Sequence, residues 1–164
     1  MGYQLFWTAT RIFKKICKAD EWAVVEAKVL GRLPKAWKTE QLKIRMHRKE
    51  YAEALAVLLQ GRYPLSDWDG AYEIQTAKKL ESRFPEEILK YYLSGLGNLK
   101  TNGVRKEYAR KAKLMVKVRH VLIDILQDEN RWLIFARQVK RDNLKRPAVQ
   151  EEFAKTVTGW RELD

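Results

Sequence analysis

The stretch EYAEALAVLL, residues 50–59, is similar in residue pattern to FPEEILKYYL at residues 84–93. The two segments align at an offset of 34 residues, which is the period of tetratricopeptide repeats. A second pair, LGRLPKAW at 30–37 and QGRYPLSDW at 60–68, shares a helix end, Gly-Arg, an apolar residue, proline and a later tryptophan. These echoes predict stacked antiparallel helical hairpins, a tetratricopeptide-like α-solenoid. An irregular helical bundle is the alternative.

Helical periodicity extends over almost the whole chain, and no segment shows convincing strand alternation. With 8 Gly and 4 Pro among 164 residues, few positions break a helix. The sequence therefore predicts a single all-α domain spanning residues 1–164, either stand-alone or the C-terminal region of a larger protein. About nine helices are expected, at 4–17, 20–32, 38–47, 49–60, 67–83, 85–97, 103–127, 129–143 and 147–157.

Several helix ends follow from individual residues. Gly31 and Gly61 are expected to end helices in the left-handed conformation. Pro85 and Pro147 stand where a first helical turn accepts proline, and Asp128 is placed to cap the following helix.

The composition excludes some classes of protein. The chain is 46% hydrophobic, too apolar for a disordered protein. The single cysteine, Cys17, excludes an internal disulfide and a cysteine-rich zinc site, which suits a reducing compartment. No apolar run is long enough to span a bilayer, and the N-terminus does not have the charge order of a secretory signal. A cytoplasmic protein is expected.

Positive charge is concentrated in two parts of the chain. The net charge is +12, with +7 in residues 1–50 and +9 in residues 100–146, while residues 51–99 and 147–164 each carry −2. This asymmetry indicates a directional field suited to an acidic partner.

The predicted long helix at 103–127 has an apolar arc over more than half of its circumference, so we expect packing on two sides. The arc contains Val104, Tyr108, Ala109, Ala112, Leu114, Met115, Val116, Val118, Val121, Leu122, Ile123, Ile125 and Leu126. Lys111 falls inside this arc and can pair with Glu107 one turn earlier. The remaining narrow face carries Lys106, Arg110, Lys113, Lys117, His120 and Asp124.

We call Lys106, Arg110, Lys113 and Lys117 the basic ridge. A second basic set, Arg131, Arg137, Lys140, Arg141, Lys145 and Arg146, follows on the next predicted helix and its exit. Successive like charges on one helix face cost stability, which favours a role in binding an acidic protein segment. Contacts with a nucleic-acid backbone are the alternative, although no aromatic stacking residues are interleaved with the ridge. A merely solvated face is the third interpretation.

No catalytic signature is present. The chain lacks GxSxG, Walker, GxGxxG and HExxH motifs, so no catalytic residue, metal ligand or cofactor is expected. The competing hypothesis is an enzyme with a loop-borne metal at Asp67 and Asp69 of DWDG, although Asp-x-Asp-Gly more often forms a turn.

Residues 84–154 resemble the helical C-terminal region of SWIM zinc finger family proteins. The resemblance rests on FPEEILKYYLSGLGNL (84–99), EYARKAKLMVKVRHVLIDI (107–125) and ENRWLIFARQVKRDNLKRPAVQEEF (129–153). It implies an interaction scaffold whose other part contacts DNA or protein. The zinc ligands of that family, Cys-x-Cys and Cys-x-His, are absent here, so zinc binding is not implied.

The predicted first helix carries Tyr3, Phe6, Trp7 and Phe13, a large aromatic content for the end of a helical array. Because solenoid ends expose apolar surface unless capped, we expect this helix to self-associate or to dock on a neighbour. Lying on an anionic membrane is the alternative.

Overall fold

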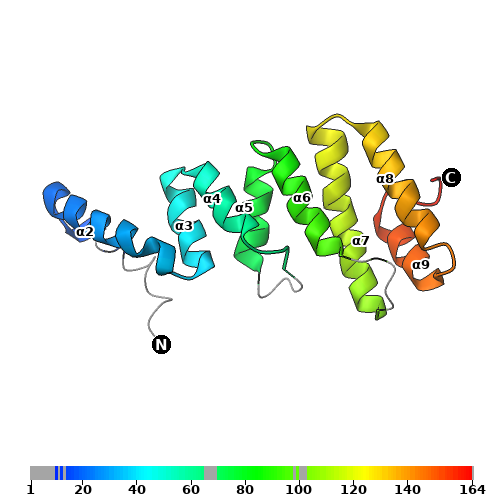
Figure 1. Ribbon diagram of the computed structural model, residues 1–164, viewed down its shortest axis with the longest axis horizontal. Helices are drawn as coiled ribbons and strands as arrows, with labels where there is room; N and C mark the ends of the chain where they lie inside the picture. Colours follow the sequence, from blue (N-terminus) through cyan, green and yellow to red (C-terminus); the bar gives the residue numbers. More distant parts are fainter. Residues whose placement is uncertain are drawn as a thin grey trace. The chain divides into compact units, whose positions relative to one another are not determined.

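The computed structural model describes residues 10, 12, 14–64, 70–97, 99 and 103–163. All regular secondary structure in these residues is helical (Figure 1), which confirms the all-α class. In this part of the chain no helix combines the length and the apolar character needed to cross a membrane. The predicted helix at 4–17 and the Asp67–Asp69 loop lie largely or wholly outside the described residues.

The chain divides into two compact units. The N-terminal unit comprises Met1–Gly61 with Ala71–Ala77, and the C-terminal unit comprises Arg62–Gly70 with Lys78–Asp164. Helix α5 (Ala71–Leu80) contributes to both units.

The N-terminal unit contains α2 (Ala19–Arg32), the 3₁₀ turn η1 (Leu33–Lys35), α3 (Lys38–Arg48) and α4 (Tyr51–Leu59). α3 packs against α4 after a tight turn at Lys49, whose φ of 62° places it in the left-handed region. The buried apolar side chains of this pair are Leu42, Ile44, Ala54, Leu55, Val57 and Leu58.

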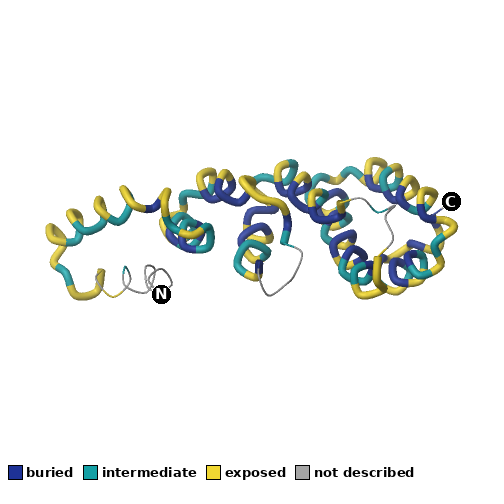
Figure 2. Tube along the Cα trace, turned by 60° about the horizontal axis from the view of Figure 1, so that its bottom comes forward, coloured by how far each residue is buried: buried dark blue, intermediate teal, exposed yellow. Residues whose placement is uncertain are grey.

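Helix α2 differs from its neighbours because none of its residues is buried. Figure 2 shows it in yellow and teal along its length. Its apolar residues Trp22, Val25, Val29 and Leu30 are only half-buried, and Val24 is exposed. The amphipathic pattern of α2 is thus not matched by a core beneath it in the described residues.

The C-terminal unit contains α6 (Pro85–Leu96), α7 (Arg105–His120), α8 (Glu129–Asp142) and α9 (Pro147–Thr156). α7 packs against both α6 and α9, as the wide apolar arc predicts. A π-helical turn, η2 (Val121–Ile125), continues α7 and contacts α8.

Aromatic side chains fill two parts of this unit. The ring of Tyr63 lies 5.5 Å from that of Tyr91 and 5.6 Å from that of Tyr92, measured between centroids. Near the C-terminus, the rings of Phe153 and Trp160 lie 4.8 Å apart, and the indole nitrogen of Trp160 donates to Gln150 Oε1 at 2.9 Å.

The 34-residue echo coincides with the pattern of burial. In α4 the buried residues are Ala54, Leu55, Val57 and Leu58, and in α6 they include Ile88, Leu89, Tyr91 and Tyr92. Each of these α6 positions is 34 residues after its counterpart in α4. In the shorter echo, Leu33 and Tyr63 both occupy the place between arginine and proline, and both are buried.

Some expected helix ends are confirmed and others are wrong. Proline occupies the first turns of α6 and α9, and the Asp128 carboxylate accepts from the backbone nitrogen of Arg131 at 2.9 Å. Gly31 instead lies inside α2, which runs to Arg32, and neither Gly31 nor Gly61 has a positive φ. The 3₁₀ turn that follows α2 removes the need for a left-handed glycine there.

Candidate partner-binding surface

The basic ridge lies on the face of helix α7 that is left when its apolar faces are buried. Tyr108, Ala112, Leu114, Met115 and Val118 are buried, in agreement with the predicted arc. Two members of that arc are exposed instead: Val104, which is the residue before the first turn, and Val116.

Lys111 shows how the helix accommodates a charge inside its apolar arc. The residue is only 5% exposed, and its Nζ lies 3.2 Å from Glu107 Oε1. A buried ammonium group needs such a partner, since an unpaired charge in an apolar setting is costly. The predicted Glu107–Lys111 pair is therefore confirmed.

The four side chains of the basic ridge have different surroundings. Lys106 and Lys113 are exposed and make no hydrogen bond or ion pair with another described residue. Arg110 is half-buried, and its Nη1 donates to the carbonyl oxygen of Pro64 at 3.3 Å. The Nζ of Lys117 lies 5.6 Å from the centroid of the Tyr92 ring, a cation–π distance.

The helical wheel predicted that all four ridge side chains face solvent. The structure shows that only two of them do. Arg110 and Lys117 bind within the C-terminal unit because the Pro64 carbonyl and the Tyr92 ring lie within their reach. Lys106 and Lys113 remain available to an external anion.

At the end of the ridge, His120 joins a polar network. Its Nδ1 lies 2.7 Å from Asp124 Oδ2, and its Nε2 lies 3.6 Å from Glu81 Oε2. The other oxygen of Glu81 accepts a hydrogen bond from the hydroxyl of Tyr92, and both Glu81 and Tyr92 are buried. Burial and this hydrogen bond raise the pKa of Tyr92 well above its ordinary value, so the phenol stays protonated.

This network has the contacts of a structural connection. Glu81 follows the end of α5, Tyr92 belongs to α6, and His120 and Asp124 belong to α7 and η2. Both oxygens of Glu81 have partners, and Tyr92 is fully buried, so neither group faces an incoming substrate.

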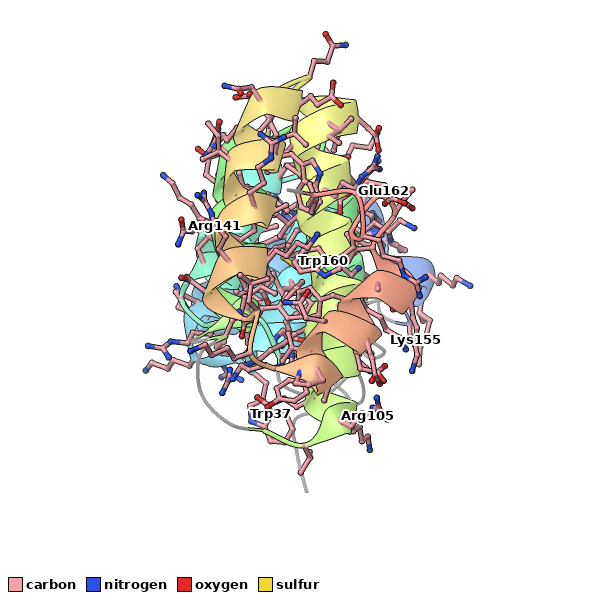
Figure 3. All side chains as sticks on the ribbon, turned by 90° about the vertical axis from the view of Figure 1, so that its right-hand side faces the viewer. Trp37, Arg105, Arg141, Lys155, Trp160 and Glu162 are labelled. Atoms are coloured by element: carbon pink, nitrogen blue, oxygen red, sulfur yellow. The ribbon has the colours of Figure 1, made fainter. Side chains whose placement is uncertain are left out.

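The second basic set lies on α8 and its exit. Arg137 and Arg141 are exposed, and neither side chain has a polar partner within the described part of the chain. Figure 3 shows Arg141 on the outer side of α8, away from the buried Trp160. Lys140 instead turns inward, where its Nζ donates to the carbonyl oxygens of Arg161, at 3.0 Å, and Leu163.

Three exposed cations of this unit are paired with acids, whereas Lys78, Lys79, Lys90, Lys145 and Arg161 are exposed without an ion pair to a described residue. Arg131 makes a bidentate contact with Glu86, with distances of 2.7 and 3.1 Å, and this hydrogen bonding lowers the pKa of Glu86. Arg105 pairs with Glu151 and Glu152. Lys155 donates to Glu152 at 3.0 Å, and this bond is the main cause of the lowered pKa of Glu152.

Two apolar residues missed by the sequence reasoning lie beside the second basic set. Ile134 is 59% exposed and Leu144 is 62% exposed. Ile134 stands between Arg131 and Arg137 on the solvent face of α8, and the amphipathic pattern of α8 contained this signal.

The N-terminal unit has a cavity of about 300 Å³ with a mixed lining. Trp22, Leu30 and Ile44 supply apolar walls, and Arg48 supplies a cation. The guanidinium of Arg48 is already engaged by Glu26 and Glu50, which raises its pKa. Lys14 supplies a second cation to the lining.

Among the described residues, no three His, Cys, Asp or Glu side chains are grouped so that they could hold a metal ion. Asp67 and Asp69 lie outside those residues, so the loop-borne metal hypothesis stays a prediction.

The chain matches no family model, no curated protein and no solved structure.

Proposed function

We propose that this protein is a non-catalytic helical-repeat scaffold whose C-terminal unit binds an acidic protein partner. The binding groups are Lys106 and Lys113 on α7 and Arg137 and Arg141 on α8. A cytoplasmic location and a relationship to the helical region of SWIM zinc finger proteins remain parts of this proposal.

The scaffold part of the proposal is supported by the repeated burial pattern. The buried positions of α4 recur in α6 at an offset of 34 residues. A shared register of buried residues is expected when two segments play the same part in stacked helical hairpins. Helix α7, packed on both α6 and α9, also has the two-sided burial of an internal helix in an array.

The observation that carries the binding part is the distribution of ion pairs. Arg105, Lys111, Arg131 and Lys155 all contact carboxylates within the unit. Lys106, Lys113, Arg137 and Arg141 have no such contact with any described residue, although they are exposed. Uncompensated cations of one sign attract acidic partners and accelerate their association.

An acidic protein fits this surface better than a nucleic acid does. Nucleic-acid surfaces without base readout usually combine cations with exposed aromatic platforms. The exposed large apolar residues beside the α8 arginines are the aliphatic Ile134 and Leu144. Arginine is enriched at protein interfaces.

The N-terminal unit supports a separate proposal of self-association. α2 buries none of its residues, and its half-buried apolar side chains gain by contact with another surface. We expect the predicted helix at 4–17 to take part. Sedimentation should show a monomer–oligomer equilibrium that shifts to monomer when residues 1–16 are deleted, and a monomer at all concentrations would contradict the proposal.

The binding function is tested by affinity capture with two variants of equal charge. One carries Lys106→Glu, Lys113→Glu, Arg137→Glu and Arg141→Glu. The control carries Lys15→Glu, Lys28→Glu, Arg32→Glu and Lys35→Glu, all exposed residues of the N-terminal unit. Each reversal replaces a positive charge with a negative one and lowers the net charge by two, so both variants change the net charge equally.

Proteins captured by the parent should be retained by the control and lost by the C-terminal variant. Quantitative mass spectrometry provides the comparison, and nuclease treatment separates partners bridged by nucleic acid. Equal recovery by the parent and the C-terminal variant would contradict the proposed function.

A further inference from the structure

The outer face of α8 has a pattern more specific than positive charge. At about 100° per residue, Ile134, Arg137, Gln138 and Arg141 fall within an arc of about 100°. All four are exposed, while Trp132, Ala136 and Val139 on the other side are buried. The turn after α8 extends this face, because the backbone nitrogen of Leu144 donates to the carbonyl of Arg141 at 3.3 Å.

The resulting order along the face is apolar, arginine, arginine, apolar. Ile134 and Leu144 are ten residues apart, which corresponds to about 15 Å along a helix. Arg137 and Arg141 lie between them, one turn apart. An amphipathic helix with carboxylates between two apolar residues at the same spacing would complement this surface in both shape and charge.

The exposed cations of α8 and α7 differ in residue type, and this difference fits the proposed pattern. The exposed cations without an ion pair to a described residue are arginines on α8, whereas on α7 they are Lys106 and Lys113. The guanidinium group forms bidentate bonds with carboxylates, and this unit already contains one such pair in Arg131–Glu86. A lysine ammonium is a more hydrated point charge, suited to attracting a partner at longer range.

We propose that the outer face of α8 docks an acidic amphipathic helix of the partner. Its apolar residues cover Ile134 and Leu144, its carboxylates bind Arg137 and Arg141, and Lys106 and Lys113 speed its approach. This inference rests on the proposed function and specifies the partner segment.

The test uses the whole chain and two labelled acidic peptides of about 18 residues, roughly five helical turns. In the patterned peptide, two leucines have the spacing of Ile134 and Leu144, with glutamates between them on the same face. The control peptide has the same composition, with the leucines on opposite faces. Fluorescence anisotropy measures affinity, and stopped-flow mixing measures the rates.

The parent should bind the patterned peptide at least about tenfold more tightly than the control peptide. The variant Ile134→Ser/Leu144→Ser should bind both peptides equally. Ile16→Ser/Val24→Ser, which alters exposed apolar residues of the N-terminal unit, should retain the parent's preference.

Rates distinguish the two kinds of cation. Arg137→Lys/Arg141→Lys should raise the dissociation rate several-fold and leave the association rate unchanged, because the charge remains but the bidentate geometry is lost. Lys106→Gln/Lys113→Gln should mainly lower the association rate.

Two results would overturn the inference, and they differ in what they say about the proposed function. If the parent binds both peptides equally and the four-residue charge reversal abolishes binding, the acidic-partner function stands and docking on α8 is wrong. If neither peptide binds the parent, the docking inference is wrong, and the capture experiment decides the function separately.

Discussion

Helices α2 and α7 are of similar length, at 14 and 16 residues, and both are amphipathic and charged, yet only one of them is part of a core. α7 buries six residues, including a lysine, whereas α2 buries none. The difference shows that a helical pattern specifies which face will be covered but does not specify what covers it. In the C-terminal unit α6 and α9 cover α7.

The first prediction compares the contributions of a buried and a half-buried side chain from the two units, and its effect should be the largest. Phe153→Ala removes a fully buried ring that packs against Trp160, and should lower the free energy of unfolding by about 3–5 kcal/mol. Trp22→Ala on α2 should cost no more than about 1 kcal/mol, because Trp22 is half-buried. Urea unfolding followed by circular dichroism measures both, and equal losses would remove the contrast between the two units.

A second prediction uses two glycines with opposite surroundings. A Cβ on Gly95 would lie 2.7 Å from Tyr63 Cβ and 2.8 Å from Leu114 Cδ2, so Gly95→Ala should destabilise the protein by about 1–3 kcal/mol. A Cβ on Gly31, inside α2, meets nothing within 4 Å. Gly31→Ala should therefore stabilise by about 0.5–1 kcal/mol, through helix propensity.

Thermal unfolding of the two alanine variants gives the signs directly. A stabilised Gly95→Ala protein would show that the α6–α7 contact yields easily, and a destabilised Gly31→Ala protein would reveal a covering of α2.

A third prediction concerns the Tyr92–Glu81 hydrogen bond and its pH dependence. Tyr92→Phe leaves the buried Glu81 carboxylate without this donor and should cost about 1–2 kcal/mol near neutral pH. Because the folded-state pKa of Tyr92 lies above its ordinary value of 10.0, its contribution is fully present below pH 10.0 and is lost as the pH rises further.

The stability difference between the parent and Tyr92→Phe should therefore stay constant up to about pH 10 and shrink as the pH rises from there toward about pH 12. Chemical unfolding at several pH values measures it. A difference that stays constant or grows across this range would show that Tyr92 ionises as readily in the folded protein as in the unfolded chain.

Much of the fold could be predicted from the sequence because it depends on local periodicity. The helix positions, the prolines of α6 and α9, the Asp128 cap and the Glu107–Lys111 pair are all consequences of spacing along one helix. The 34-residue echo aligns α4 with α6, and the structure shows that the aligned positions are buried in the same register.

Features that depend on distant residues could not be predicted in this way. The turn at Lys49 uses a left-handed residue that is not glycine. The π-helical turn after His120 leaves no mark in the apolar pattern. Arg110 and Lys117 contact the Pro64 carbonyl and the Tyr92 ring instead of facing solvent. These partners are distant in sequence and come near only after folding.

The most direct test of the central claim asks whether binding belongs to particular cations of the C-terminal unit or to positive charge in general. Affinity for the patterned acidic peptide is measured by anisotropy for the parent and for the two four-residue charge-reversal variants, at about 0.15 M salt, where distant charges are screened. Circular dichroism confirms that each variant keeps its helices. We predict that reversing Lys106, Lys113, Arg137 and Arg141 weakens binding at least about tenfold, while reversing Lys15, Lys28, Arg32 and Lys35 changes it much less. Equal losses in the two variants would contradict the claim and leave net charge as the only determinant.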